Sequence, residues 1–390
     1  GAFTIPTMKK IGYKPVQAAA IEAAASTGGQ IMPPIMGAAA FLMVGFTGIP
    51  YIKIIAAAAI PAILYFGVLA LYAQLHGLKL NIPPSTEKVN YKELLLTAPL
   101  FVLPLILLII FLAMGQTAMF AVSRGLLLLI VLGLIRKETR PSLSEAAKGC
   151  ASGALMGAQI GVSTACIGII IKVFTMTGLG IVLPNAIVGW SGGILGFTLI
   201  IGAIVAIILG MGMPTSAVYV LAAIVIAPAL VRGGLDILQA HLFVLYFACL
   251  NFVTPPVAVV ALIASKLAGA PFLKTAVEST KAALAGFVVP FLFILSPILI
   301  LQHQDLLAAL TGILSAVLIL TALQIAICNY YFTGLSRLER VAFVVAAAAL
   351  FIYLATEIYT LLAIGIIVFT LLTIRQVKKR LLGKTLIRDS

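Results

Sequence analysis

The chain has 390 residues, of which 63% are hydrophobic and only 9% are charged, and its mean hydropathy is +1.22. This composition excludes an ordinary soluble domain and predicts an all-α polytopic membrane protein embedded in a lipid bilayer. The net charge of +14 does not indicate nucleic acid as a partner, because the Lys and Arg residues fall in short loops between apolar runs. Positive loops of this kind orient membrane spans.

Residues for catalysis or metal binding are scarce. The sequence has only three histidines and contains neither an HExxH nor a CxxC motif. Its four cysteines lie singly in apolar segments, where they are typical of small core residues: Cys150, Cys166, Cys249 and Cys328. We therefore predict no enzyme activity, no catalytic residues, no cofactor and no metal site other than one for coupling ions.

The first charge-free run covers residues 23–52 and is interrupted near its middle by Ser26-Thr27-Gly28-Gly29-Gln30-Ile31-Met32-Pro33-Pro34. Prolines lack an amide hydrogen and crowd the preceding turn, whereas glycines tolerate unusual backbone angles. A transmembrane helix should break here, and its freed carbonyl groups then need protein, water or an ion as partners. An ordinary proline kink is the simpler alternative.

Four further spans are predicted before the next interruption, at residues 54–75, 94–114, 117–135 and 146–178. A polar loop at 77–93 follows the first of them. From residue 173 to residue 231 no residue is charged, and the segment 210–216 breaks this run. We interpret 187–209 and 217–231 as the arms of a re-entrant hairpin with its tip at 210–216. Two full spans are the alternative, but their connecting loop would be unusually apolar for an aqueous position.

A second broken helix is predicted at residues 238–265, where Asn251, Thr254, Pro255 and Pro256 interrupt the apolar run. This stretch aligns with the first break at an offset of 222 residues, which pairs Pro33 and Pro34 with Pro255 and Pro256. Matching interruptions in two halves point to an inverted repeat and to the binding site of a secondary transporter. The paired register argues against two unrelated proline kinks.

The C-terminal part is predicted to contain a span at 306–331, two short spans within 341–374 and a basic cytoplasmic tail. In this layout Lys53 and Arg232 lie outside, Arg124 and Lys172 lie in or near the membrane, and every other Lys or Arg lies inside.

The predicted units are residues 1–78 (the closing part of the first repeat), 79–148 (connecting spans), 149–302 (the second repeat) and 303–390 (accessory spans and tail).

The sequence of residues 5–37 closely resembles the large membrane subunit of TRAP (tripartite ATP-independent periplasmic) transporters. Within it, residues 23–37 are AAASTGGQIMPPIMG. The ASTGGQIMPP stretch resembles the TAXI branch, whose permeases are often fused. The segment Gly210–Thr215 and Thr254-Pro255-Pro256 resemble the signatures of the second half. Because the counterpart of 210–216 would precede residue 1, we expect an N-terminally truncated chain that is inactive alone.

The resemblance implies an elevator-type sodium symporter of the bacterial inner membrane that imports an organic acid. It implies two partners, a periplasmic TAXI-type substrate-binding protein and a small membrane subunit, separate or fused. The implied sodium ligands are Ser26, Thr27, Gly28, Gly29, Gly210, Gly212, Pro214, Thr215, Asn251 and Thr254. The implied substrate-binding residues are Gln30, Pro33, Pro34, Ser216, Pro255 and Pro256.

The chemistry of these residues agrees with that expectation. Hydroxyl groups and freed carbonyls supply the oxygen ligands that a hard cation prefers, and helix N-termini favour an anion. Arg124 and Lys172 are possible carboxylate partners, but each is more simply a scaffold charge. Glu22 is either a proton or cation group, or an interface residue near the cytoplasmic end.

Other functional classes fit less well. A channel would show a pore-lining polar stripe, and an intramembrane enzyme would need a catalytic constellation that the spans lack. The closest alternative is a stand-alone divalent-anion sodium symporter that works without a binding protein.

The charge bias gives a topology that labelling can test. Cysteines introduced at Lys10, Lys92, Lys137 and Lys384 should react only from the cytoplasm, whereas cysteines at Gly48 and Arg232 should react from outside. A cysteine at Lys137 that reacts from outside would contradict the arrangement.

Overall fold

The computed structural model describes residues 1–83, 91–135, 139–302 and 305–388, and these fold into helices α1 to α18 and one short 3₁₀-helix. Within these ranges there is no β-strand, only an isolated bridge between Tyr330 and Gly334. Eight helices are long and apolar enough to cross a membrane, or nine if a bent pair is one span. The expected all-α polytopic membrane fold is therefore confirmed.

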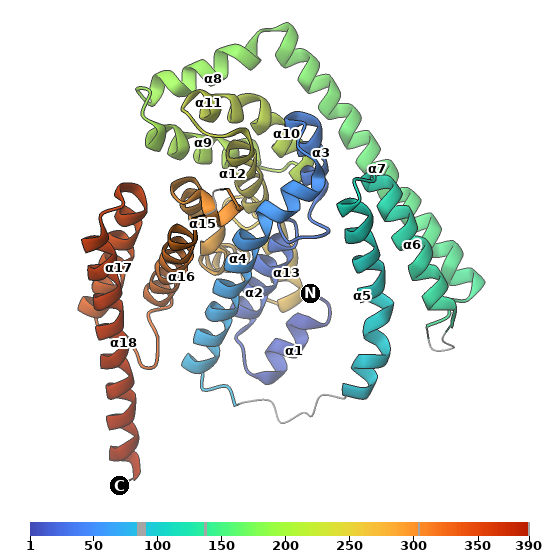
Figure 1. Ribbon diagram of the computed structural model, residues 1–390. Coiled ribbons are helices and arrows are strands. Elements are labelled where there is room, and N and C mark those ends of the chain that lie inside the picture. Colours follow the sequence, from blue (N-terminus) through green and yellow to red (C-terminus); the bar gives the residue numbers. More distant parts are fainter. Residues whose placement is uncertain (84–90, 136–138, 303–304, 389–390) are drawn as a thin grey trace.

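The helices form a central body with one group on either side (Figure 1). The central body holds α1–α4 and α8–α15. Its most buried element is α12 (Ile237–Leu250), in which every residue from Leu238 onward is buried. On one side lie α5 (Tyr91–Ala113), α6 (Ala118–Ile135) and α7 (Leu143–Met176), and on the other lie α16 (Leu306–Cys328), α17 (Arg337–Thr356) and α18 (Tyr359–Arg388).

Two stretches of the central body correspond helix by helix. The chain breaks after α2 (Pro15–Gly28) and after α12 (Ile237–Leu250), so both bounds differ by the 222 residues seen in the sequence. Each break contains a cis Pro-Pro bond and a left-handed residue, Met36 in the first and Ala258 in the second. Helices then resume as α3 (Ala38–Thr47) and α13 (Val259–Ala268), which end at the left-handed glycines Gly48 and Gly269.

The following helices also correspond, since α4 (Tyr51–Lys79) has its counterpart in α14 (Phe272–Ala282) and α15 (Leu284–Leu295). The short 3₁₀-helix Pro297–Ile300 continues α15. Before the breaks, α1 (Thr4–Ile11) corresponds to α11 (Ala227–Arg232).

The region predicted as a re-entrant hairpin contains α9 (Leu195–Leu209), α10 (Thr215–Val225) and α11. Its first arm was expected at 187–209, and this start is wrong, because residues 187–190 belong to α8 (Leu179–Trp190). The chain turns between α8 and α9 at Gly192 and Gly193, whose positive φ angles end the helix. The 15 residues of α9 rise about 22 Å, less than the roughly 30 Å of a hydrocarbon core.

The helices of the α5–α7 group touch the central body sparsely and expose most of their apolar side chains. Part of the predicted polar loop at 77–93 lies outside the described residues, as does Lys137. In the C-terminal group, the left-handed Glu357 separates α17 from α18, so the prediction of two spans is confirmed, but they run beyond the predicted 341–374, over Arg337–Thr356 and Tyr359–Leu382.

The C-terminal group is held by an ion cluster around Glu339, whose side chain is 1% exposed. Glu339 lies 2.6 Å from Lys379 and 3.2 Å from Arg375 on α18, and it also caps α17 through Ser336. Replacing it with Gln keeps its shape but removes the charge that both cations face.

We expect Glu339→Gln to destabilise the protein by about 1–3 kcal/mol, because the hydrogen bonds from charged partners weaken while both partners remain partly exposed to solvent. Thermal unfolding in detergent measures this change. The exposed Glu357→Gln is the control, and an equal loss in both variants would show that the cluster contributes nothing specific.

Candidate functional site

The first break is braced by two tyrosines of α4. The hydroxyl of Tyr51 donates to the carbonyls of Pro34 and Ile35, both at 3.0 Å. The hydroxyl of Tyr65 donates to the carbonyl of Ala24 at 2.8 Å, and its ring lies so close to Gly28 that a Cβ there would stand 2.3 Å from a ring carbon. Tyr51 thus satisfies carbonyls that the broken helix leaves open, and Tyr65 packs against the last turn of α2.

The second break meets the tip of the hairpin. Gly210 packs against Asn251, because a Cβ at Gly210 would lie 2.5–2.8 Å from the Asn251 side chain. Asn251 donates to the carbonyl of Ala248, and Thr280 of α14 donates to the carbonyl of Val253 at 3.0 Å. Asn251 and Gly210 are both buried, which makes this a closed contact inside the protein.

One side chain joins the two halves directly. The amide oxygen of Gln30, in the first break, accepts a hydrogen bond from the Thr215 hydroxyl at 2.6 Å. The same oxygen accepts from the thiol of Cys249 at 3.7 Å, just before the second break. Gln30 therefore links the first break to the hairpin tip and to α12.

The remaining predicted residues occupy different positions. Thr27 is buried, and its hydroxyl has no hydrogen-bond partner among the described residues, whereas Ser26 is exposed and donates to Glu22 at 3.2 Å. Thr254 donates to the carbonyl of Leu250 at 2.7 Å, one turn back in its own helix. Exposed positions are Gly29, Gly212, Pro214 and Pro256, and partly buried ones are Pro33, Pro34, Ser216 and Pro255.

The structure therefore brings together Gln30 with Thr215 and Gly210 with Asn251. No hydrogen bond joins the Thr215 and Thr254 hydroxyls, which point to separate acceptors in the part of the chain that is described. Arg124 lies 5.0 Å from the Phe120 ring on its own helix α6, which supports its interpretation as a scaffold charge.

Sequence reasoning missed four contributors to the site: Tyr51, Tyr65, Cys249 and Thr280. Cys249 was interpreted as a core residue, although the repeat offset pairs it with Thr27 and so marks it as a site position. Tyr51 and Tyr65 stand two heptads apart on α4, and nothing in an apolar helix distinguishes them from packing residues.

Three helices begin at these breaks without a side-chain cap: α3, α10 and α13. The first amides of α10 are consequently left for water or an anion, whereas the Val260 amide of α13 donates to the carbonyl of Phe252 and the Ala40 amide of α3 donates to that of Gly37. In contrast, α12 and α17 begin with capping boxes.

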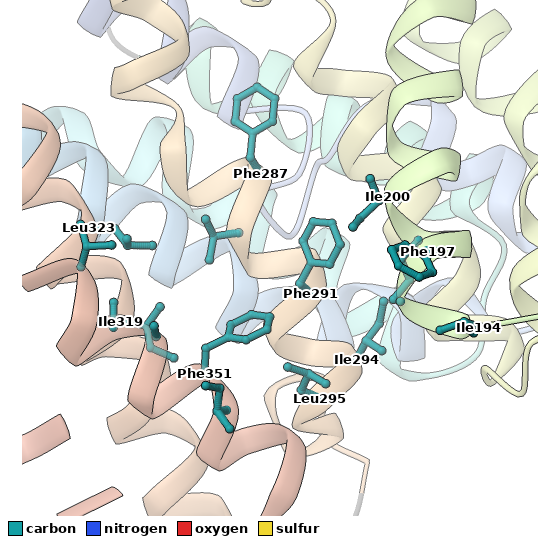
Figure 2. A pocket seen from close by; sticks show the side chains of 17 residues that line it. Ile194, Phe197, Ile200, Phe287, Phe291, Ile294, Leu295, Ile319, Leu323 and Phe351 are labelled. Atoms are coloured by element: carbon teal, nitrogen blue, oxygen red, sulfur yellow. The ribbon is translucent and has the colours of Figure 1, made fainter. Parts of the chain in front are cut away.

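A large cavity of about 720 Å³ lies elsewhere, between α9, α15, α16 and α17 (Figure 2). Apolar residues such as Phe197, Phe291 and Phe351 line it. It offers no polar group to a carboxylate, so it does not suit an organic acid, and the breaks remain the candidate site.

These features define a multi-pass helical membrane protein in which two broken helices meet a hairpin tip at the Gln30–Thr215 and Gly210–Asn251 contacts. This architecture is typical of secondary transporters. Residues 1–307 match the sequence model of the tripartite ATP-independent periplasmic transporter family, DctM component. The chain belongs to this family and is a permease component of a tripartite transporter. A search of curated proteins found no match.

The contact between the hairpin tip and the second break can be tested with one methyl group. We expect Gly210→Ala to destabilise the protein by about 1–3 kcal/mol, because the new Cβ overlaps the Asn251 side chain.

Gly196→Ala on the same helix is the control, since its Cβ would enter open space. Thermal unfolding of both variants gives the comparison. Equal stability of Gly210→Ala and wild type would mean that the tip is not packed as described.

Proposed function

We propose that this permease component couples the inward movement of sodium to the uptake of an organic acid across the bacterial inner membrane. The observation that supports this best is the Gln30–Thr215 bond, because it joins the polar breaks of the two halves at one place. A periplasmic TAXI-type binding protein delivers the substrate, and a small membrane subunit completes the complex.

Sodium binding is supported by the oxygen atoms at the breaks. The buried Thr27 hydroxyl has no partner, so its lone pairs suit a hard cation beside the first break. Thr215 and Thr254 each donate their proton to another group, which leaves their oxygen lone pairs available to a cation at the second break. Neither arrangement needs a buried carboxylate.

An anionic substrate is supported by the first amides of α10, which begins at Thr215 and has no side-chain cap. A carboxylate accepts hydrogen bonds from such amides and gains from the positive end of the helix dipole. Bound sodium would add further attraction, so that cation and anion assist each other.

An elevator motion is supported by the distribution of contacts. The central body is densely packed through α12, whereas α5–α7 touch it at few places (Figure 1). We propose that α5–α7 form the static scaffold and that the breaks and the hairpin move as one unit.

The orientation follows from the position of the charges. Lys9 binds the carbonyl of Ala268 and Lys79 binds that of Cys328, so positive residues gather at one end of the central body. At the other end, Gln302 donates to Asp236. We propose that the lysine-rich end, together with the C-terminus, faces the cytoplasm.

The threonines of the second break provide the test of sodium coupling. In the full-length transporter, Thr254→Val and Thr215→Val should raise the sodium concentration needed for half-maximal uptake by roughly five- to 150-fold, because each removes one ligand worth about 1–3 kcal/mol.

Thr373→Val is the matched control, because its hydroxyl also bonds one turn back, to Phe369, but on α18. Unchanged sodium dependence in both break variants, with normal expression, would identify the breaks as structural kinks. Uptake without any periplasmic binding protein would instead favour the stand-alone symporter.

A further inference from the structure

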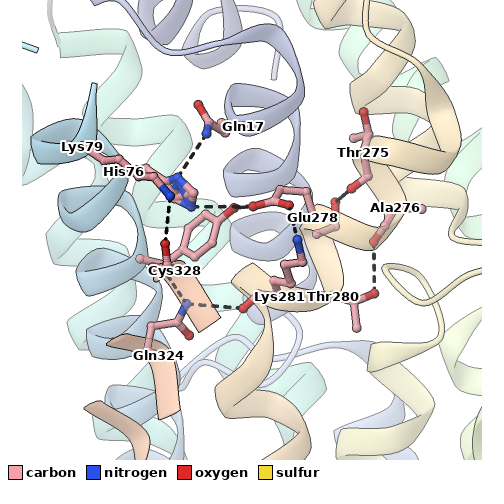
Figure 3. A network of polar contacts seen from close by, with 12 residues as sticks. Gln17, His76, Lys79, Thr275, Ala276, Glu278, Thr280, Lys281, Gln324 and Cys328 are labelled. Atoms are coloured by element: carbon pink, nitrogen blue, oxygen red, sulfur yellow. Dashed lines mark hydrogen bonds and ion pairs between the residues drawn. The ribbon is translucent and has the colours of Figure 1, made fainter. Parts of the chain in front are cut away.

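A second polar cluster lies outside the breaks, where α2, α4, α14 and α16 meet (Figure 3). Its centre is Glu278 of α14, whose side chain is 18% exposed. One carboxylate oxygen accepts from the Tyr72 hydroxyl at 2.7 Å and faces Nε2 of His76 at 3.6 Å. The other oxygen pairs with Lys281 at 2.9 Å.

The proton position on His76 follows from its second neighbour. Nδ1 of His76 lies 3.1 Å from the amide nitrogen of Gln17 on α2. An amide nitrogen only donates, so Nδ1 accepts, and the neutral ring carries its proton on Nε2, facing Glu278. At 3.6 Å this proton has no hydrogen-bond partner in the described part of the chain, and the buried Gln17 Oε1 has none there either.

The same neighbours, Gln17 and Glu278, can also accept hydrogen bonds from a protonated His76 ring. A half-turn of the Gln17 amide exchanges its nitrogen and oxygen, and the partnerless oxygen then accepts from a proton on Nδ1. The charged ring would face an acceptor on each side, Gln17 and Glu278, the latter a carboxylate that attracts it. A neutral ring leaves Nε2 of His76 and Oε1 of Gln17 without a partner among the described residues. With a charged ring, Oε1 accepts from Nδ1 and Nε2 can approach the Glu278 carboxylate, while the Gln17 amide nitrogen takes the buried position that the oxygen leaves.

The other titratable groups around His76 are Tyr72 and Lys79 on α4, Lys281 on α14 and Cys328 on α16. The two lysines oppose a positive ring, and Glu278 favours it. Because these opposite charges compete around a buried ring, its protonation depends on how close Glu278 and the two lysines lie.

The cluster is tied to both breaks. Two residues beyond Glu278, Thr280 bonds the carbonyl of Val253 inside the second break. Gln17 stands on α2, which runs into the first break, and His76 stands on α4, whose Tyr65 packs on Gly28. A shift of α4 against α14 would therefore displace residues at both breaks.

We propose that His76 and Glu278 form a proton-binding site that is linked to the cation site at the breaks. Proton binding draws Nε2 of His76 toward Glu278 and adds one positive charge to the central body. The added charge opposes a second cation. Acid pH should therefore weaken sodium binding, and sodium should weaken proton binding by the same factor. The linkage rests on the proposed sodium coupling, whereas the proton site does not.

Thermal unfolding of the purified full-length transporter can measure the linkage without knowledge of the substrate. Sodium chloride would be exchanged for choline chloride at constant ionic strength, at pH 5.5 and at pH 8. For wild type, the sodium concentration that gives half of the full stabilisation should be about fivefold or more higher at pH 5.5. In His76→Gln, which hydrogen-bonds but does not titrate, this difference should vanish.

His241→Gln is the matched control, because His241 is also buried and bonds a tyrosine, Tyr219, at 2.7 Å, but lies outside the cluster. It should keep the wild-type difference. Retention of the full difference in His76→Gln, or its loss in the control alone, would overturn the linkage.

A direct measurement tests the proton site even if sodium does not stabilise wild type, a result that would count against sodium coupling only. The ring nitrogen resonances of His76, assigned by their loss in His76→Gln, should move between pH 5 and pH 8. Their titration should shift in Glu278→Gln, which keeps the shape and removes the charge. Resonances that stay constant over this range would overturn the proton site.

Discussion

The structure depends on one constraint, which is that a broken helix inside a bilayer must find partners for its freed backbone groups within the protein. The partners here come largely from other helices. Tyr51 and Tyr65 of α4 satisfy carbonyls of the first break and its preceding helix, and Thr280 of α14 satisfies one of the second. Each half consequently braces its own irregular backbone, and the Gln30–Thr215 hydrogen bond joins the two halves.

The two breaks share a backbone plan but not a chemistry. Thr27 in the first half corresponds to Cys249 in the second, and Gln30 corresponds to Phe252. The first break therefore presents a buried hydroxyl and an amide, whereas the second presents Asn251 and Thr254. The same backbone plan therefore presents different polar groups in the two halves.

Helix α14 connects features that would otherwise be separate. Within three residues it carries Glu278, which anchors the polar cluster, and Thr280, which bonds the second break. Lys281 follows, and its carbonyl is contacted by Gln324 of α16. A small movement of this one helix would displace the second break, the cluster and the C-terminal helices together, because rigid packed helices transmit displacement along their length.

The amino-acid sequence by itself determined the membrane class, the two breaks and their offset, because hydropathy, proline and glycine act locally. It also indicated the turn at Glu357, where charge interrupts an apolar run. It misplaced the start of the first hairpin arm, because in a uniformly apolar stretch no change of polarity marks where one helix ends and the next begins.

Only the tertiary structure decided which residues meet. Gln30 and Thr215 are 185 positions apart, and no spacing rule predicts their bond. Tyr65 became a brace for Gly28, and Glu278 became the partner of Tyr72 and His76, through packing of helices distant in sequence. Such contacts depend on how two similar halves fit against each other, and a local sequence pattern carries no information about that fit.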